Sequence, residues 1–139
     1  MIVYFDSSAY VKLLVEEDGS DVAAALWDGC DAAVSSRLAY PEVRAALAAA
    51  GRAGRFDPQR QRQAERAWEG YWAATRAVEL TEVVALRAGE LAGEHALRGA
   101  DAVHLASALV VGRSAVVFAA WDQRLGVGAR AVGLALAPS

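Results

Sequence analysis

Short apolar runs alternate along the chain with longer stretches in which apolar residues recur every three or four positions. The short runs are typical of strands buried on both faces, and the longer stretches are typical of amphipathic helices. Their alternation predicts an α/β domain built around a mostly parallel sheet of four or five strands. We expect strands at Ile2–Phe5, Ala32–Ser35, Ala77–Leu80 and Ala115–Ala119, with a final edge strand over Val132–Leu136.

Capping residues, prolines and glycines mark the ends of the predicted helices. Asp6, Ser7 and Ser8 supply cap chemistry for a helix after the first strand. A loop over residues 51–56 separates two helical patterns and predicts a helical hairpin, whose second helix begins at Asp57-Pro58. Gly99 is expected to break the chain. The remaining helices are expected at Ser20–Trp27, from Pro41-Glu42 to Ala50, Thr81–Leu97, Ala102–Val110, and as one turn over Asp122–Leu125.

Composition narrows the class of protein. The chain has 139 residues, of which 55% are hydrophobic, and its 14 Lys+Arg against 17 Asp+Glu give a net charge of -3. These values exclude disorder, coiled coil and collagen, and they argue against a protein that holds nucleic acid by charge alone. The chain shows no internal repeat or linker. We therefore expect a single domain over residues 1–139.

The compartment is predicted from cysteine usage and from apolar segments. Cys30 is the only cysteine, so no internal disulfide forms, and this cysteine usage agrees with a reducing compartment. The amino terminus lacks the positive region of a signal peptide, and His104, Gly112 and Arg113 interrupt the most apolar tract. We expect a cytoplasmic protein without a membrane span.

Four acidic residues occupy equivalent local positions. Asp6 and Asp122 each follow a predicted strand, and Glu42 and Asp101 each open a predicted helix. Taken singly, each is explained as a helix cap or as an acid favoured by the helix dipole. Taken together they suggest a site, because the carboxyl ends of strands in an open α/β sheet line a common crevice.

A site made of these four carboxylates predicts a bound cation, since like charges in one pocket oppose each other's ionisation. Oxygen ligands without cysteine or a histidine pair select Mg²⁺ or Mn²⁺ over zinc. One or two such ions activate water, orient a phosphate and neutralise charge on a leaving oxygen. The residues therefore point to metal-dependent phosphodiester chemistry.

Four segments carry a resemblance that covers essentially the whole chain in order and spacing. They read IVYFDSSAYVKL at residues 2–13, SSRLAYPEV at 35–43, LRGADAVHLA at 97–106 and WDQRL at 121–125. These segments resemble the motifs of PIN-domain ribonucleases, specifically the VapC toxins of bacterial toxin–antitoxin pairs. The one departure from the family pattern is Trp121, which is bulkier than the residue expected before Asp122.

The resemblance implies a PIN-like three-layer α/β/α fold and an Mg²⁺- or Mn²⁺-dependent endoribonuclease. Asp6 and Asp101 would be the most direct metal ligands, and Glu42 and Asp122 would complete the catalytic cluster through metal or water. The implied partners are a structured RNA substrate (tRNA, rRNA or mRNA), a cognate VapB-type antitoxin and a second copy of the chain in a homodimer.

Other residues keep two interpretations at this stage. Ser7 either bonds a carboxylate or a metal-bound water, or caps a helix, and His104 either packs beneath the site or acts as a ligand or base. The arginines between Arg52 and Arg66 either track an RNA backbone or form a solvated helical surface. An aromatic stripe either belongs to the core or forms part of a dimer contact or an antitoxin groove; it consists of Trp68, Tyr71 and Trp72.

Two rival functions compete with the nuclease. A phosphotransfer enzyme would use Asp6 as a covalent nucleophile, but Ser8 stands where its second acid belongs, and no late lysine is present. A catalytically inactive PIN-fold module that binds RNA or protein would have no need of all four acids. Subtracting these four from the 17 acidic residues leaves 13, against 14 basic residues, so the remaining surface is compatible with RNA.

Overall fold

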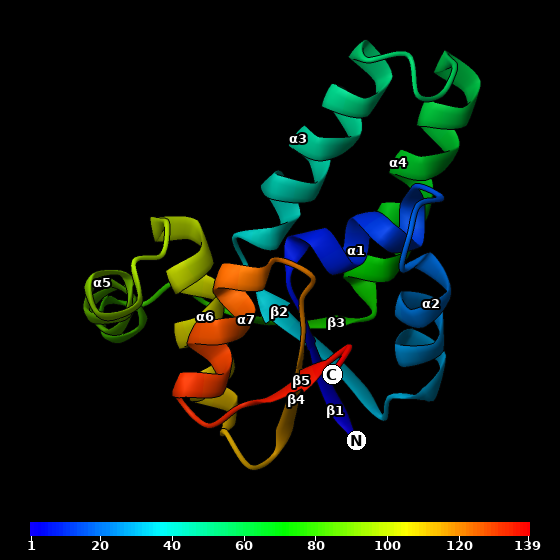
Figure 1. Ribbon diagram of the computed structural model, residues 1–139. Coiled ribbons are helices and arrows are strands. Elements are labelled where there is room, and N and C mark those ends of the chain that lie inside the picture. The colour runs from blue at the N-terminus through cyan, green and yellow to red at the C-terminus, as the bar shows by residue number, and fades with distance from the viewer.

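A five-stranded sheet forms the middle of the protein, with all neighbouring strands parallel and in the order β3-β2-β1-β4-β5 (Figure 1). The computed structural model describes residues 1–139. The strands are β1 Ile2–Phe5, β2 Ala32–Ser36, β3 Thr75–Val78, β4 Val116–Ala119 and β5 Ala135–Ala137. The helices are α1 Ser7–Leu14, α2 Ser20–Gly29, α3 Ala39–Arg52, α4 Pro58–Ala73, α5 Glu82–His95, α6 Gly99–Val111 and α7 Gln123–Ala131.

The central strand β1 is buried on both faces, which explains its continuous apolar run. Val3 and Phe5 pack with residues of α1, α3 and α4 on one face of the sheet. Tyr4 points to the other face and packs with residues of α5, α6 and α7. Two hydrophobic cores therefore sandwich the sheet, and the predicted three-layer α/β/α fold is confirmed.

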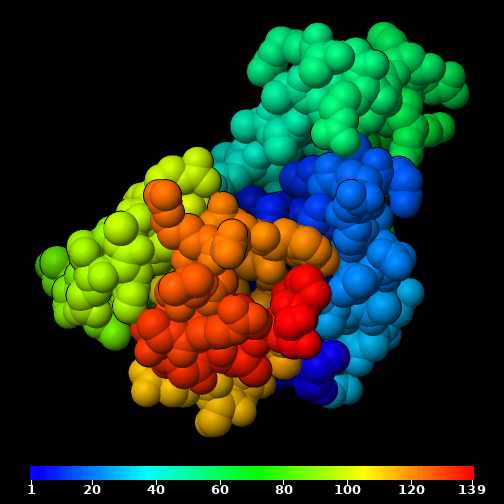
Figure 2. Space-filling model, in the orientation of Figure 1, coloured from blue at the N-terminus to red at the C-terminus, as the bar shows by residue number.

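The α3–α4 hairpin, here called the arm (residues 39–73), extends away from the sheet (Figures 1 and 2). Asp57 caps α4 by accepting a hydrogen bond from the backbone N–H of Arg60, and Pro58 occupies the first helical turn. Buried Ala64 and Trp68 of α4 join the core that lies against α1. The predicted hairpin and its start at Asp57-Pro58 are confirmed. None of the seven helices combines the length and apolar character needed to cross a bilayer.

Several predicted boundaries are wrong near glycines and at the sheet edges. The single turn expected at Asp122–Leu125 extends to Ala131, and the edge strand that follows begins only at Ala135. Two glycines lower the helix propensity of this segment, but buried Leu125 and Ala129 pack into the core and override it. Strand β3 starts two residues before the expected Ala77.

Gly99 opens helix α6 and does not break the chain as expected. Because the helix begins at Gly99, Asp101 lies in its first turn, where the helix dipole favours a negative charge. Helix α3 likewise begins at Ala39, two residues before Pro41, and carries Glu42 in its first turn. Both acids therefore stand at helix N-termini.

Candidate functional site

All four predicted acids line one cavity of about 290 Å³. Asp6 directly follows β1 and Asp122 lies three residues after β4, and these two strands are neighbours in the sheet. Glu42 and Asp101 reach the same cavity from the first turns of α3 and α6. The full lining is Asp6, Ser7, Ser8, Lys12, Glu42, Arg98, Asp101, His104, Trp121 and Asp122.

Asp6 is the most buried of the four acids, with 5% of its surface exposed. It caps α1, and its Oδ1 accepts hydrogen bonds from the backbone N–H of Ala9 at 2.9 Å and from the Ser8 hydroxyl at 2.7 Å. Burial raises the pKa of Asp6, and its effect outweighs the lowering by nearby His104 and by the hydrogen bonds from Ser8 and Ala9. Because no cationic side chain pairs with Asp6 and its Oδ2 has no protein donor, this oxygen is available to a metal ion.

Glu42 is held by two side chains from different elements. Its Oε1 accepts hydrogen bonds from the Ser7 hydroxyl at 2.5 Å and from Nε2 of His104 at 2.6 Å. Partial burial by itself raises the pKa of Glu42, but the hydrogen bonds from His104 and Ser7 outweigh it, and the pKa is lowered. Glu42 is therefore ionised and oriented at neutral pH.

These contacts place Ser7 and His104 against Glu42, in the lining of the cavity. Ser7 bonds a carboxylate, and the cap of α1 is Asp6, not Ser7. His104 is buried at the inner side of the cavity, with 2% of its surface exposed.

Asp101 and Asp122 lie at the more open side of the cavity. Arg98 donates a hydrogen bond from Nε to Oδ2 of Asp101 at 3.2 Å, one helical turn away. Asp122 caps α7 by accepting a hydrogen bond from the backbone N–H of Leu125 at 2.8 Å. A larger adjoining hollow of about 720 Å³ shares these three residues with the site and adds Gln123, Arg124 and Val127.

Three cavity residues were not predicted from the sequence: Ser8, Lys12 and Arg98. The spacing of Arg98 three positions before Asp101 is a signal for such a pair, since residues three apart on a helix are neighbours. Lys12 is engaged elsewhere, because its ammonium bonds Glu17 and lies 5.2 Å from the ring centre of Trp121. The site therefore has no lysine that neutralises the acids.

The donor set fits a divalent cation of the Mg²⁺ or Mn²⁺ kind, because the acids contribute only hard oxygen ligands. No three side chains among the His, Cys, Asp and Glu residues form a ready cage for an ion. Mg²⁺ does not need such a cage, since it keeps several waters and is held by one or two carboxylates together with substrate phosphates. The arrangement thus suits an ion shared between protein and a phosphate-bearing ligand.

The chain matches proteins of known family over most of its length. The PIN domain profile matches residues 3–124. Ribonuclease VapC45 of Mycobacterium tuberculosis strain CDC 1551 / Oshkosh is 64% identical over 138 residues, which cover 99% of this chain and 96% of the relative. Ribonuclease VapC47 of the same strain is 33% identical over 141 residues, with coverage of 98% and 96%.

Solved structures share the fold at low sequence identity. FitAcB from Neisseria gonorrhoeae aligns with a TM-score of 0.69 at 19% identity, covering 98% of this chain and 96% of that one. VapC20 of Mycobacterium tuberculosis, described as a Sarcin-Ricin loop cleaving toxin, aligns with a TM-score of 0.66 at 16% identity, covering 90% and 93%. The profile match and the near-complete similarity to a named ribonuclease place this chain in the PIN-domain family, among the VapC-like ribonucleases.

Proposed function

We propose that this protein is a toxin endoribonuclease that hydrolyses RNA phosphodiester bonds with the help of Mg²⁺ or Mn²⁺. The observation that carries the proposal is that four acids far apart in the sequence line one cavity. Asp6 and Asp101 would be the most direct ligands, and Glu42 and Asp122 would complete the cluster through the ion or through water. We take residues 1–139 as one domain with this activity.

The chain's own side chains orient the acids, and the ion when bound supplies charge neutralisation and water activation. Asp6 and Glu42 are each held through one carboxylate oxygen only, so the second oxygen of each is left for ligand. Arg124 borders the adjoining hollow without a carboxylate partner and offers its guanidinium group to RNA phosphates, next to Arg98, which is paired with Asp101. This combination of acids for the ion and arginines for the backbone supports RNA as substrate.

Exposed arginines on the arm extend the basic surface available to RNA. They form none of the ion pairs found in the structure, whereas Arg55 pairs with Glu17 and Arg44 pairs with Glu65 and Glu69. Guanidinium groups without a carboxylate partner retain their capacity for phosphate. The four are Arg52, Arg60, Arg62 and Arg66.

Removal of divalent metal tests the reaction. We expect purified protein to cut a structured RNA in Mg²⁺ or Mn²⁺, to lose the activity in excess EDTA, and to regain it when either ion is restored in excess. RNA fragments separated on a denaturing gel give the rate. Cleavage at an unchanged rate by metal-free protein in EDTA would contradict the metal role. Protein that binds neither ion and cuts no RNA would favour the inactive PIN-fold module.

The toxin role includes a cognate VapB-type antitoxin that neutralises the enzyme. A short gene directly upstream, encoding a small DNA-binding protein, is the expected source of this partner. The expected result of co-expression is a stable complex in which RNA cleavage and growth inhibition are both suppressed.

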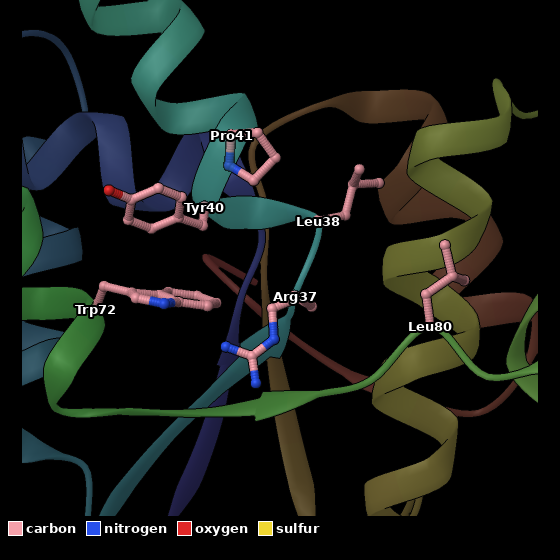
Figure 3. Close-up of a pocket in the computed structure, with 6 residues that line it drawn as sticks. All are labelled: Arg37, Leu38, Tyr40, Pro41, Trp72 and Leu80. Atoms are coloured by element: carbon pink, nitrogen blue, oxygen red, sulfur yellow. The ribbon is translucent and has the colours of Figure 1, made fainter.

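A second copy of the chain is the proposed partner of an apolar surface formed by α5 and the adjoining pocket. Leu80, Val83 and Leu86 recur at helical spacing and are 51%, 73% and 64% exposed. They continue into a pocket of about 480 Å³ that is mostly apolar (Figure 3). Arg37 and Glu79 form an ion pair beside this pocket. In a twofold dimer the same surface of each subunit faces the other, so Arg37 of one subunit can lie near Glu79 of the second. The pocket is lined by Arg37, Leu38, Tyr40, Pro41, Trp72 and Leu80.

Replacing Leu86 with aspartate is expected to convert the dimer to monomer at micromolar concentration, because a charge would be buried at the interface. Sedimentation velocity measures the assembly. The matched control is Val127→Asp on α7, which places the same charge at another exposed apolar residue and is expected to remain dimeric. A monomeric wild-type protein, or a dimeric Leu86→Asp protein, would contradict the assignment.

A further inference from the structure

A buried chain of hydrogen bonds runs from the sheet to Glu42 through Tyr4 and His104. The backbone N–H of Ser36 donates to the Tyr4 hydroxyl oxygen at 3.0 Å. That oxygen lies 2.7 Å from Nδ1 of His104, and Nε2 of the same ring lies 2.6 Å from Oε1 of Glu42. Tyr4 is fully buried and His104 nearly so, which excludes bulk water as an alternative partner for either group.

The donors and acceptors along this chain determine the tautomer of the neutral ring. The Tyr4 oxygen accepts from the backbone N–H of Ser36, and Nδ1 of His104 lies 2.7 Å from it, in position to accept the hydroxyl proton. Burial raises the pKa of Tyr4 well above its usual range, so the hydroxyl keeps this proton. In the neutral ring the proton therefore lies on Nε2, from which it is donated to Glu42. The opposite tautomer would turn a lone pair of Nε2 toward the carboxylate oxygen of Glu42, 2.6 Å away.

The chain determines which oxygen of Glu42 is free. The bonds from His104 and Ser7 both end on Oε1, and Oε2 receives none from the protein. We propose that His104 is a positioning residue: through its Nε2–H it holds Glu42 with Oε2 toward the cavity, and Tyr4 locks the tautomer that makes this possible. The inference rests on the proposed function, in which Glu42 serves the metal-dependent reaction. Partners of this kind, which orient a ligating group, typically change metal affinity or activity by about 10- to 100-fold when removed.

Three variants separate positioning from packing. His104→Leu keeps an apolar side chain but no donor, and we expect kcat to fall about 10- to 100-fold with little change in KM, together with weaker Mn²⁺ binding by calorimetry. A glutamine at this position can accept a hydrogen bond from Tyr4 and donate one to Glu42. His104→Gln is therefore expected to recover most of the wild-type kcat and Mn²⁺ affinity. Val110→Ala is the control on the same helix, because Val110 is 60% exposed and does not line the cavity, and it is expected to behave as wild type.

The tautomer gives a readout that does not depend on cleavage. In ¹⁵N-labelled protein in mildly alkaline buffer, we expect His104 to show a protonated Nε2 and an unprotonated Nδ1, and Tyr4→Phe to abolish this preference. A protonated Nδ1 in the wild type, or a folded His104→Leu protein with unchanged kcat and Mn²⁺ affinity, would overturn the inference. If the wild type cuts no RNA, the proposed function fails, while the tautomer and the Mn²⁺ titration still decide the role of His104.

Discussion

Replacing Asp6 with asparagine is expected to abolish RNA cleavage while making the protein more stable at neutral pH. The substitution removes a carboxylate that is buried, unpaired with any cation and proposed to bind metal. The loss of activity should reach at least about 10²-fold, the scale on which enzymes respond to losing one group that stabilises transition-state charge. The fold should persist, because asparagine is as good an N-cap for α1 as aspartate.

The stability gain follows from the raised pKa of Asp6. At pH values between the pKa of Asp6 in the unfolded chain and its higher pKa in the folded protein, the folded state holds the carboxyl proton more tightly than the unfolded state does. The free energy of unfolding of the wild type therefore falls as the pH rises through this range. Above the folded pKa the full cost of the buried charge is present, and Asp6→Asn removes it. The difference in Tm between variant and wild type should therefore be largest at neutral pH and should shrink as the pH falls toward the unfolded value.

Thermal unfolding in metal-free buffer at several pH values measures this difference, and gel assays measure cleavage. Asp6→Ala is the control that removes both the charge and the cap, and the missing cap costs about 0.5–2 kcal/mol relative to asparagine. Asp101→Asn is expected to abolish cleavage in the same way. A soluble Asp6→Asn protein that cuts RNA as fast as wild type would refute the role of this carboxylate.

Replacing Trp68 with alanine is expected to lower the free energy of unfolding by about 3–5 kcal/mol. The Trp68 side chain is fully buried and attaches the arm to the rest of the protein. Its ring meets Tyr10 of α1 edge to face at 4.9 Å between centroids, and it also packs on Tyr40 and Trp72. Such a loss is a large fraction of the 5–15 kcal/mol typical of folded domains.

Trp68→Phe is the matched control for this substitution. The indole N–H of Trp68 has no hydrogen-bond partner, so phenylalanine loses volume but no hydrogen bond and should cost much less. Urea unfolding of both variants measures the difference. An alanine variant within about 1 kcal/mol of wild type would show that the aromatic cluster does not hold the arm.

The fold could be predicted because its central strands are buried on both faces. Ile2–Phe5 was located from its continuous apolar run, and the strand expected at Ala115–Ala119 is one residue shorter in the structure. The last helix was underestimated because two glycines argue against it locally, and only the packing of its buried residues reveals it. Boundaries set by tertiary contacts are not present in a local pattern.

The acids of the site could also be located, because each also caps or opens a helix and so leaves a local mark in the sequence. The hydrogen-bond partners that hold these acids could not be located from the sequence. The bond between His104 and Glu42 joins residues 62 positions apart, and the bond between Tyr4 and His104 joins residues 100 apart. The aromatic stripe likewise divides in the structure: Trp68 lies in the core and Trp72 lines the pocket in Figure 3.

Helix α3 has one further consequence, since it carries Glu42 in its first turn and forms half of the arm. Glu42 and Arg52 lie about 15 Å apart along one continuous helix. A rigid-body tilt of the arm would therefore move Glu42 relative to His104, which lies on α6. Helix α3 thus links the angle of the arm to the position of one carboxylate of the acidic cluster.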